Sequence, residues 1–406
     1  MINKRFIPVI LLTFVNTIGF SILIPVLPFV TEKYGEGPLV YGALLSAYSL
    51  FQFLAAPLIG SLSDKFGRRP TLILSQAGTF LSWIIFGAAY FVPNIAIGPV
   101  ALPIIVIMFS RIVDGITGGN VSVTNAYVAD ITAPSERTKY YGILGAALGF
   151  GFIFGPAIGG FTASFAIGYL GTTIAAAIIS LITLVITITN LTESLKHEDL
   201  SHNLKIKFWQ EINVFQKIKK FSTNTHIKEL FIKRLFFALA MGAFSSTFAF
   251  YAKDSLNLDA KQLGFLMLFI GIFAIFNQAY LVNLIAKKLS NKTTFNIGQV
   301  VLAISISLLF FHPTIGWFVA IMYLTNLGIS LSIPTFKAML TSSVDHKQQG
   351  QIAGVDESIM AGSNGFIPVI AGAVYAAISA NAFLIFAVLP FIPFALKPLF
   401  ARRSRR

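Results

Sequence analysis

The sequence predicts an all-α membrane protein with twelve transmembrane helices in two six-helix bundles, and three observations lead to this prediction. Hydrophobic residues make up 55% of the 406 residues and charged residues only 11%, a balance that excludes an ordinary soluble domain. Apolar stretches of about 20 residues recur along the chain and match the hydrocarbon thickness of a bilayer. They are continuous and contain Gly and Pro, which favours helices over alternating barrel strands.

Each apolar stretch is long enough to cross a membrane as a helix. We expect spans at residues 6–30, 41–63, 71–92, 102–127, 140–163, 171–191, 232–252, 262–285, 294–311, 315–338, 350–377 and 380–400. The longest polar segment follows the sixth span. It divides the chain into an N-terminal bundle (1–192), a cytoplasmic linker (193–233) and a C-terminal bundle (234–406).

The basic residues are distributed asymmetrically over the predicted loops. With the N-terminus inside, 26 of the 30 Lys and Arg residues fall in cytoplasmic segments, and only Lys33, Lys253 and Lys261 fall outside. Cytoplasmic loops of membrane proteins carry such an excess of Lys and Arg. Both termini are therefore expected in the cytoplasm. The net charge of +14 reflects this orientation and does not indicate nucleic-acid binding.

The chain lacks the residue patterns that enzymes and cofactor sites require. It contains no Cys, and its five His residues stand in loops or at helix ends without paired ligand spacing. We find neither a nucleophile with its base nor a phosphate-binding loop. The sequence therefore predicts no metal, no cofactor and no enzymatic activity.

The two halves of the chain contain a weak internal repeat. Sliding the second half over the first by 212 positions places Gly142 on Gly354 and Pro156 on Pro368. Two six-helix halves related in this way imply a central site that each side of the membrane reaches in turn.

A charged, glycine-containing loop separates the second and third spans. It reads Gly60-Ser61-Leu62-Ser63-Asp64-Lys65-Phe66-Gly67-Arg68-Arg69-Pro70. Gly60 allows neighbouring helices to approach, and Gly67 permits a tight turn. Asp64 can bridge to Arg68 or Arg69 at the helix ends. Membrane topology alone explains the basic residues but not the glycines or the acid.

This loop resembles the signature loop of the major facilitator superfamily, in which it serves as a conformational latch. The resemblance implies that the latch here consists of the signature-loop residues together with acidic or basic partners after the fourth span. Asp130 and Arg137 are the expected partners for Arg68 or Arg69.

The fifth span contains a run of regularly spaced glycines. It reads Gly151-Phe152-Ile153-Phe154-Gly155-Pro156-Ala157-Ile158-Gly159-Gly160. Glycines four residues apart allow close helix packing, and Pro156 removes a backbone donor. The run resembles the antiporter motif of the superfamily's proton-driven drug exporters. A generic packing seam is the alternative.

Four charged residues stand among apolar residues well inside predicted spans, where a charge costs roughly 2.5 to 3.5 kcal/mol. Arg111 and Asp114 share one helical face and resemble the family's second motif, whose arginine is tied to proton coupling. A structural ion pair that locks helices is the alternative. Asp356 and Glu357 point about 100° apart, so at most one is expected to face a central cavity, the alternative being a position near the cytoplasmic helix end. All four are candidate proton-coupling residues.

Other polar residues within the spans are candidate substrate contacts, with helix packing as the alternative for each. They are Asn16, Asn277, Gln278, Tyr323 and Asn326. Tetracycline exporters carry acids at the positions that align with Asn16 and Ser82, so tetracycline itself is not expected as a substrate.

The resemblance implies a monomeric, proton-coupled transporter in the cytoplasmic membrane of a bacterium. It would export a small hydrophobic or amphiphilic compound by alternating access, with protons, substrate and lipid as its partners. An exporter of one endogenous metabolite, such as a siderophore or an amino acid, shares every motif. Uptake by symport is a further alternative, which the antiporter motif argues against.

Overall fold

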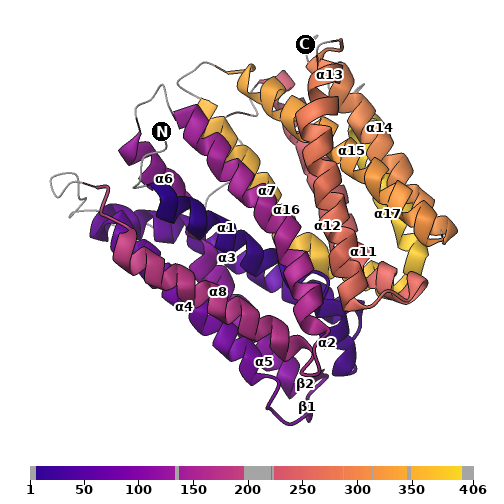
Figure 1. Cartoon of the computed structure of the whole chain (residues 1–406). Coiled ribbons are helices and arrows are strands. Elements are labelled where there is room, and N and C mark those ends of the chain that lie inside the picture. Colours follow the sequence, from indigo (N-terminus) through magenta and orange to yellow (C-terminus); the bar gives the residue numbers. More distant parts are fainter. Residues whose placement is uncertain are drawn as a thin grey trace. The chain divides into compact units, whose positions relative to one another are not determined.

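Helices account for nearly all of the chain in the computed structural model (Figure 1), which describes residues 6–132, 137–195, 221, 224–286, 288–312, 314–344 and 349–395. The helices pack into two compact units, Met1–Ile212 with Leu258–Leu268 and Asn213–Asn257 with Phe269–Arg406. Most of the predicted linker 193–233 lies outside the described residues.

The first unit follows the first six predicted spans. Its helices are α1 (Ile7–Ser21), α2 (Leu27–Lys33), α3 (Pro38–Phe66), α4 (Arg68–Ala88), α5 (Leu102–Gly118), α6 (Val121–Ile131), α7 (Arg137–Ala163) and α8 (Tyr169–Asn190). α1, α2, α3 and α5 each carry a proline in the first two positions, where its missing N–H costs no hydrogen bond.

Two of the predicted spans are broken into two helices. The first span is interrupted by turns over residues 22–26, where Pro25 cannot continue the backbone ladder of α1. The fourth span is interrupted at Gly119 and Asn120, between α5 and α6. The first break leaves polar backbone groups inside the first unit, and the second also places the buried side chain of Asn120 there.

A small β-hairpin corrects the purely α-helical prediction. β1 (Ala96–Ile97) pairs antiparallel with β2 (Val100–Ala101) between α4 and α5. Gly98, with a φ of 65°, and Pro99 form the turn. Strands of two residues are too short to show a sequence periodicity, so the sequence did not predict them.

The second unit follows the last six predicted spans. It contains α11 (Thr225–Leu256), the second part of α12 (Ala260–Phe276), the π-helix η3 (Asn277–Leu281), α13 (Val282–Ala286), α14 (Asn291–Leu308), η4 (Leu309–Phe311), α15 (Ile315–Thr341), α16 (Gln349–Ile378), η6 (Ser379–Asn381), α17 (Ala382–Val388) and η7 (Leu389–Phe391). Asn224 and Ser290 accept backbone hydrogen bonds at the starts of α11 and α14.

The predicted membrane spans all correspond to helices, which confirms the fold class. Within the described residues, nine helices are long and apolar enough to cross a membrane, and α1 and α12 are shorter apolar helices. One of the nine, Gly354–Ala395, covers the last two predicted spans, and these separate at Ser379, whose φ is 49°.

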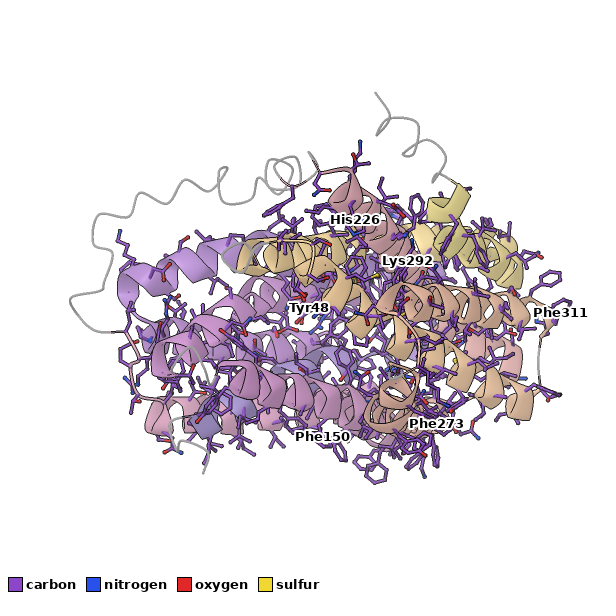
Figure 2. All side chains as sticks on the ribbon, turned by 90° about the horizontal axis from the view of Figure 1, so that it is seen from above. Tyr48, Phe150, His226, Phe273, Lys292 and Phe311 are labelled. Carbon is purple, nitrogen blue, oxygen red and sulfur yellow. The ribbon has the colours of Figure 1, made fainter. Side chains whose placement is uncertain are left out.

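The surface of the helices is rich in hydrocarbon side chains. Figure 2 shows carbon-rich side chains pointing outward around Phe150 and Phe311, which are 48% and 71% exposed. A soluble protein rarely exposes so many large apolar side chains together, whereas lipid accommodates them. The polar groups that matter for function are therefore those in the interior.

Candidate functional site

Arg111 and Asp114 form an ion pair within α5. Nη2 of Arg111 lies 3.0 Å from Oδ2 of Asp114, and the two side chains are 3% and 5% exposed. The hydroxyl groups of Thr79 and Ser82 on α4 also interact with the carboxylate. Both charges belong to the same helix, so this pair does not connect α5 to a neighbour.

Aromatic rings surround the Arg111 guanidinium. Its Cζ atom lies 5.1 Å from the ring centre of Trp83, 5.5 Å from that of Phe86 and 5.7 Å from that of Tyr48. Among the described residues, neither Nε of Arg111 nor Nε1 of Trp83 has a hydrogen-bond partner, although both atoms are buried. Such unsatisfied donors are rare in a purely structural core.

Asn16 belongs to a network of buried amides next to the break between α5 and α6. Nδ2 of Asn16 donates to Oδ1 of Asn120 over 2.9 Å, and Nε2 of Gln76 donates to Oδ1 of Asn16 over 2.7 Å. Nδ2 of Asn120 donates to Oγ of Ser75 over 2.7 Å. Oε1 of Gln76 has no partner in the described part of the chain. Sequence reasoning missed Gln76 and Asn120, although each is an amide inside a predicted span.

A second amide cluster lies in the second unit, where η3 meets α15. Nδ2 of Asn277 donates to Oδ1 of Asn326 over 3.1 Å, and Asn277 is completely buried. One turn earlier on each helix, the rings of Phe273 and Tyr323 make an edge contact at 5.1 Å. Oδ1 of Asn277 finds no partner among the described residues. Gln278 is exposed and does not join this cluster.

Asp356 is paired with a cation that the sequence analysis placed in the cytoplasm. Oδ1 of Asp356 accepts from Nε of Arg234 over 2.5 Å, and Oδ2 accepts from Nη2 over 3.2 Å. This two-contact pair connects α11 to α16, and both residues are almost fully buried. Arg234 was counted as cytoplasmic because it stands at the start of the predicted span 232–252, whereas α11 begins at Thr225 and places Arg234 more than two turns inside the helix.

Glu357 points in a different direction from its neighbour. Its side chain is 68% exposed, and Oε1 lies 3.3 Å from Nζ of the exposed Lys337 on α15. An exposed ion pair of this kind contributes little to stability. Of the two adjacent acids, only Asp356 is in the interior.

The signature loop forms a network of charges around Arg68. Nη1 of Arg68 lies 2.5 Å from Oδ1 of Asp64 and 2.6 Å from Oγ of Ser63, and Nε lies 3.2 Å from Oδ2 of Asp130. Asp130 on α6 is thus joined to the loop, as the sequence led us to expect. Arg137 is the other expected partner, and its side chain lies outside the described part of the structure.

Glu193 completes this network, and the sequence analysis assigned it only to the linker. Its carboxylate accepts from the backbone N–H groups of Arg68 and Arg69 over 2.9 and 3.0 Å. The Arg69 guanidinium in turn donates to the carbonyl oxygens of Leu191 and Ile188 near the end of α8. An acid at a helix N-terminus is favoured by the helix dipole, and this general signal could have identified such a residue from the sequence.

The glycines of the signature loop allow close contacts. A Cβ atom on Gly60 would lie 3.4 Å from Oγ of Ser122, so α3 and α6 are in direct contact there. Gly67 has a φ of 101°, and a Cβ atom on it would lie 2.5 Å from Oε2 of Glu193. Gly67 is therefore required both by its backbone conformation and by the Glu193 carboxylate.

We expect Gly67→Ala to destabilise the protein more than Gly35→Ala. Gly35 has a φ of 78° and nothing within 4 Å of an added Cβ. Gly35→Ala therefore lowers the free energy of unfolding only by the strain of a non-glycine residue in the left-handed backbone conformation, about 1 kcal/mol. Gly67→Ala also displaces Glu193 from the start of α4, which adds about 1 kcal/mol. Thermal unfolding in detergent micelles measures both variants. Equal losses of melting temperature would show that Glu193 does not hold the loop.

The glycines of the fifth span line the contact between α7 and α1. A Cβ atom on Gly151 would lie 2.5 Å from Cβ of Thr17, and one on Gly155 would overlap Oγ of Ser21. A Cβ atom on Gly159 would overlap the carbonyl oxygen of Ile22. The helix continues through Pro156. The three glycines thus allow α7 to pack against the residues at which α1 ends.

Gly160 makes a separate contact within the first unit. A Cβ atom on it would overlap the carbonyl oxygen of Ala260 and would lie 3.0 Å from Cα of Gly264. These two residues belong to the start of α12, which clusters with the first unit. Two faces of α7 are therefore in tight backbone contact.

The chain matches a known protein family over nearly its whole length. The sequence pattern of the Major Facilitator Superfamily matches residues 9–355 and 230–406. The chain is 28% identical over 382 residues to the tetracycline resistance protein, class C, of Escherichia coli, covering 92% of this chain and 90% of the relative. It is 29% identical over 379 residues to multidrug resistance protein 2 of Bacillus subtilis (strain 168), with the same coverage of 92% and 90%.

A solved structure has a similar fold. The fold of this chain matches the crystal structure of a bacterial homologue of the human lysosomal transporter Spinster, in an inward-facing and occupied conformation, with a TM-score of 0.77 at 12% identity, covering 98% of this chain and 96% of the other. The resemblance seen in the signature loop is confirmed, and the protein is a membrane transporter rather than an enzyme. The chain belongs to the Major Facilitator Superfamily.

Proposed function

We propose that this transporter exports a small hydrophobic or amphiphilic compound in exchange for protons, and that Asp114 is the residue that binds the proton. The observation that carries the proposal is the buried ion pair of Arg111 and Asp114 within a single helix. A buried charge pair costs desolvation energy, and here both charges come from one helix, so the ion pair itself does not join two helices. A functional role explains its presence better than a structural one.

The surroundings of Arg111 support an exchange of partners. Three aromatic rings hold the guanidinium in place, and its Nε has no partner among the described residues. When Asp114 takes up a proton, the attraction between carboxylate and guanidinium is lost while the rings still hold Arg111. A substrate group that binds the charged Asp114 carboxylate is displaced by the same protonation, so that proton and substrate compete for one site.

The amide clusters supply further substrate contacts in this proposal. Gln76 in the first unit and Asn277 in the second each present a buried amide oxygen without a partner in the described part of the chain. Asn277 also begins a π-helix, a distortion found frequently at functional sites. Asn16, Tyr323 and Asn326 hold these two amides in position or contact the compound directly. Gln278 is a candidate contact from the exposed side of η3.

Export through the cytoplasmic membrane of a bacterium, with both termini inside, fits the tetracycline and multidrug resistance proteins among the relatives. The network around Arg68 would then close the cytoplasmic side. Tetracycline itself is not the expected substrate, because Asn16 and Ser82 stand at the positions where tetracycline exporters carry acids. Asn16 bonds to Gln76 and Asn120, and Oγ of Ser82 donates to the carbonyl oxygen of Thr79.

Transport in proteoliposomes with an imposed pH gradient tests the proposal. Tetracycline, ethidium, a siderophore and a set of amino acids serve as probes, each measured with the gradient in both directions. We expect uphill movement of an amphiphilic probe only when protons flow the opposite way. Movement of a single metabolite would favour the dedicated exporter. Movement in the same direction as the protons would show a symporter and contradict the proposal.

A further inference from the structure

Lys33 lies against three tyrosine rings at the end of α2. Its Nζ atom is 4.3 Å from the ring centre of Tyr90, 5.0 Å from that of Tyr169 and 5.7 Å from that of Tyr34. The rings come from three places in the first unit: the residue after α2, the segment after α4 and the start of α8. We call Tyr34, Tyr90 and Tyr169 the tyrosine cage.

The walls of the cage are fixed by one another and not by the lysine. The hydroxyl oxygens of Tyr34 and Tyr169 lie 2.5 Å apart, and the Tyr34 hydroxyl donates to the carbonyl oxygen of Ala89 over 3.3 Å. Both bonds can exist together if Tyr169 donates to Tyr34. The rings of Tyr90 and Tyr169 meet edge to face at 5.5 Å. The cage is therefore preformed and would keep its shape without Lys33.

The lysine in the cage has no carboxylate partner in the described part of the chain. Its side chain is exposed, and the nearby Glu36 uses Oε1 to accept from the backbone N–H of Ala101. A lysine that serves as a structural cation normally pairs with an acid, as Lys253 does with Asp254 at 3.0 Å. Here the ammonium group is held by ring faces alone.

Several aromatic faces around one cation are the arrangement that recognises alkylammonium groups. We propose that the tyrosine cage is a binding site for organic cations, and that the Lys33 side chain occupies it when no such cation is bound. An alkylammonium group enters as the flexible lysine stem swings out. The site is independent of proton exchange at Asp114 and lies on the side of the membrane that the sequence predicts to be outside.

A purely structural role for Lys33 predicts something different. If the lysine only fastens α2 to α4 and α8, removing it loosens these helices and creates no binding. If Lys33 instead occupies the cage, removing it raises the affinity of the cage for an organic cation. In the unaltered protein only the fraction of molecules with Lys33 outside the cage can bind the cation, whereas in the variant every molecule can.

Saturation-transfer NMR of tetramethylammonium with the full-length protein in detergent micelles distinguishes the two roles. We expect Lys33→Ala to bind tetramethylammonium about tenfold more tightly than the unaltered protein. Tyr90→Leu in the Lys33→Ala background should abolish binding, whereas Tyr90→Phe in that background should retain it because the ring remains. Lys253→Ala is the matched control, since Lys253 contacts one ring and an acid.

Two results would overturn the proposal. The first is equal or undetectable binding of tetramethylammonium to the unaltered protein and to Lys33→Ala. The second is binding that survives Tyr90→Leu. Melting temperatures of all variants are measured alongside, and if Tyr90→Leu does not fold, the comparison of Lys33→Ala with the unaltered protein still decides the question.

Discussion

Asp114→Asn is expected to abolish uphill transport driven by a pH gradient while leaving the protein folded. Asparagine has nearly the shape of a protonated aspartic acid and can still bond to Thr79 and Ser82, but it cannot release a proton. If Asp114 binds the proton, the neutral form occurs in every cycle, so the protein must fold with it. The variant is therefore fixed in one of its two working states.

The size of the effect follows from the coupling. A gradient of one pH unit stores about 1.4 kcal/mol per proton, which sustains about a tenfold substrate gradient when one proton is exchanged per substrate. We expect Asp114→Asn to lose all of this accumulation in proteoliposomes. Glu357→Gln is the matched control, because Glu357 is an acid on a membrane-spanning helix whose side chain is exposed. Normal uphill transport by Asp114→Asn would exclude Asp114 as the proton carrier.

The sequence alone was enough to predict the fold because a membrane span is a local property. A run of about 20 apolar residues needs no partner to be identified, and the predicted spans all correspond to helices. The Arg111–Asp114 pair was predictable for the same reason, since its two members are one helical turn apart. Asp130 was found through the family resemblance of the signature loop.

The contacts that the sequence did not predict are those between distant segments. Arg234 and Asp356 are 122 residues apart, and Arg234 was counted among the cytoplasmic charges because it lies at a predicted boundary. Glu193 is 125 residues from Arg68 and was assigned to the linker by its polar neighbours alone. Lys33 was read as an outside loop residue. In each case only the packing of helices reveals the partner.

The Arg234–Asp356 pair leads to the second large prediction, which concerns stability. We expect Asp356→Asn to lower the free energy of unfolding of the second unit by about 3 to 5 kcal/mol, because it leaves the Arg234 guanidinium buried without a counter-ion. The pair makes two hydrogen bonds and connects α11 to α16, so its loss also removes a link between two helices. Unfolding in mixed micelles, followed by the loss of helical circular dichroism, measures the change.

The double variant Arg234→Met with Asp356→Leu separates the cost of the buried charge from any role in coupling. Removing both charges takes away the unpaired guanidinium, and well-packed apolar residues often replace a buried ion pair without loss of stability. We therefore expect the double variant to recover most of the stability lost in Asp356→Asn. If the pair is only structural, the double variant also keeps uphill transport, whereas uphill transport is lost if Asp356 carries the proton. If Asp356→Asn proves as stable as the unaltered protein but no longer transports uphill, the proton belongs to Asp356, and the assignment to Asp114 must be abandoned.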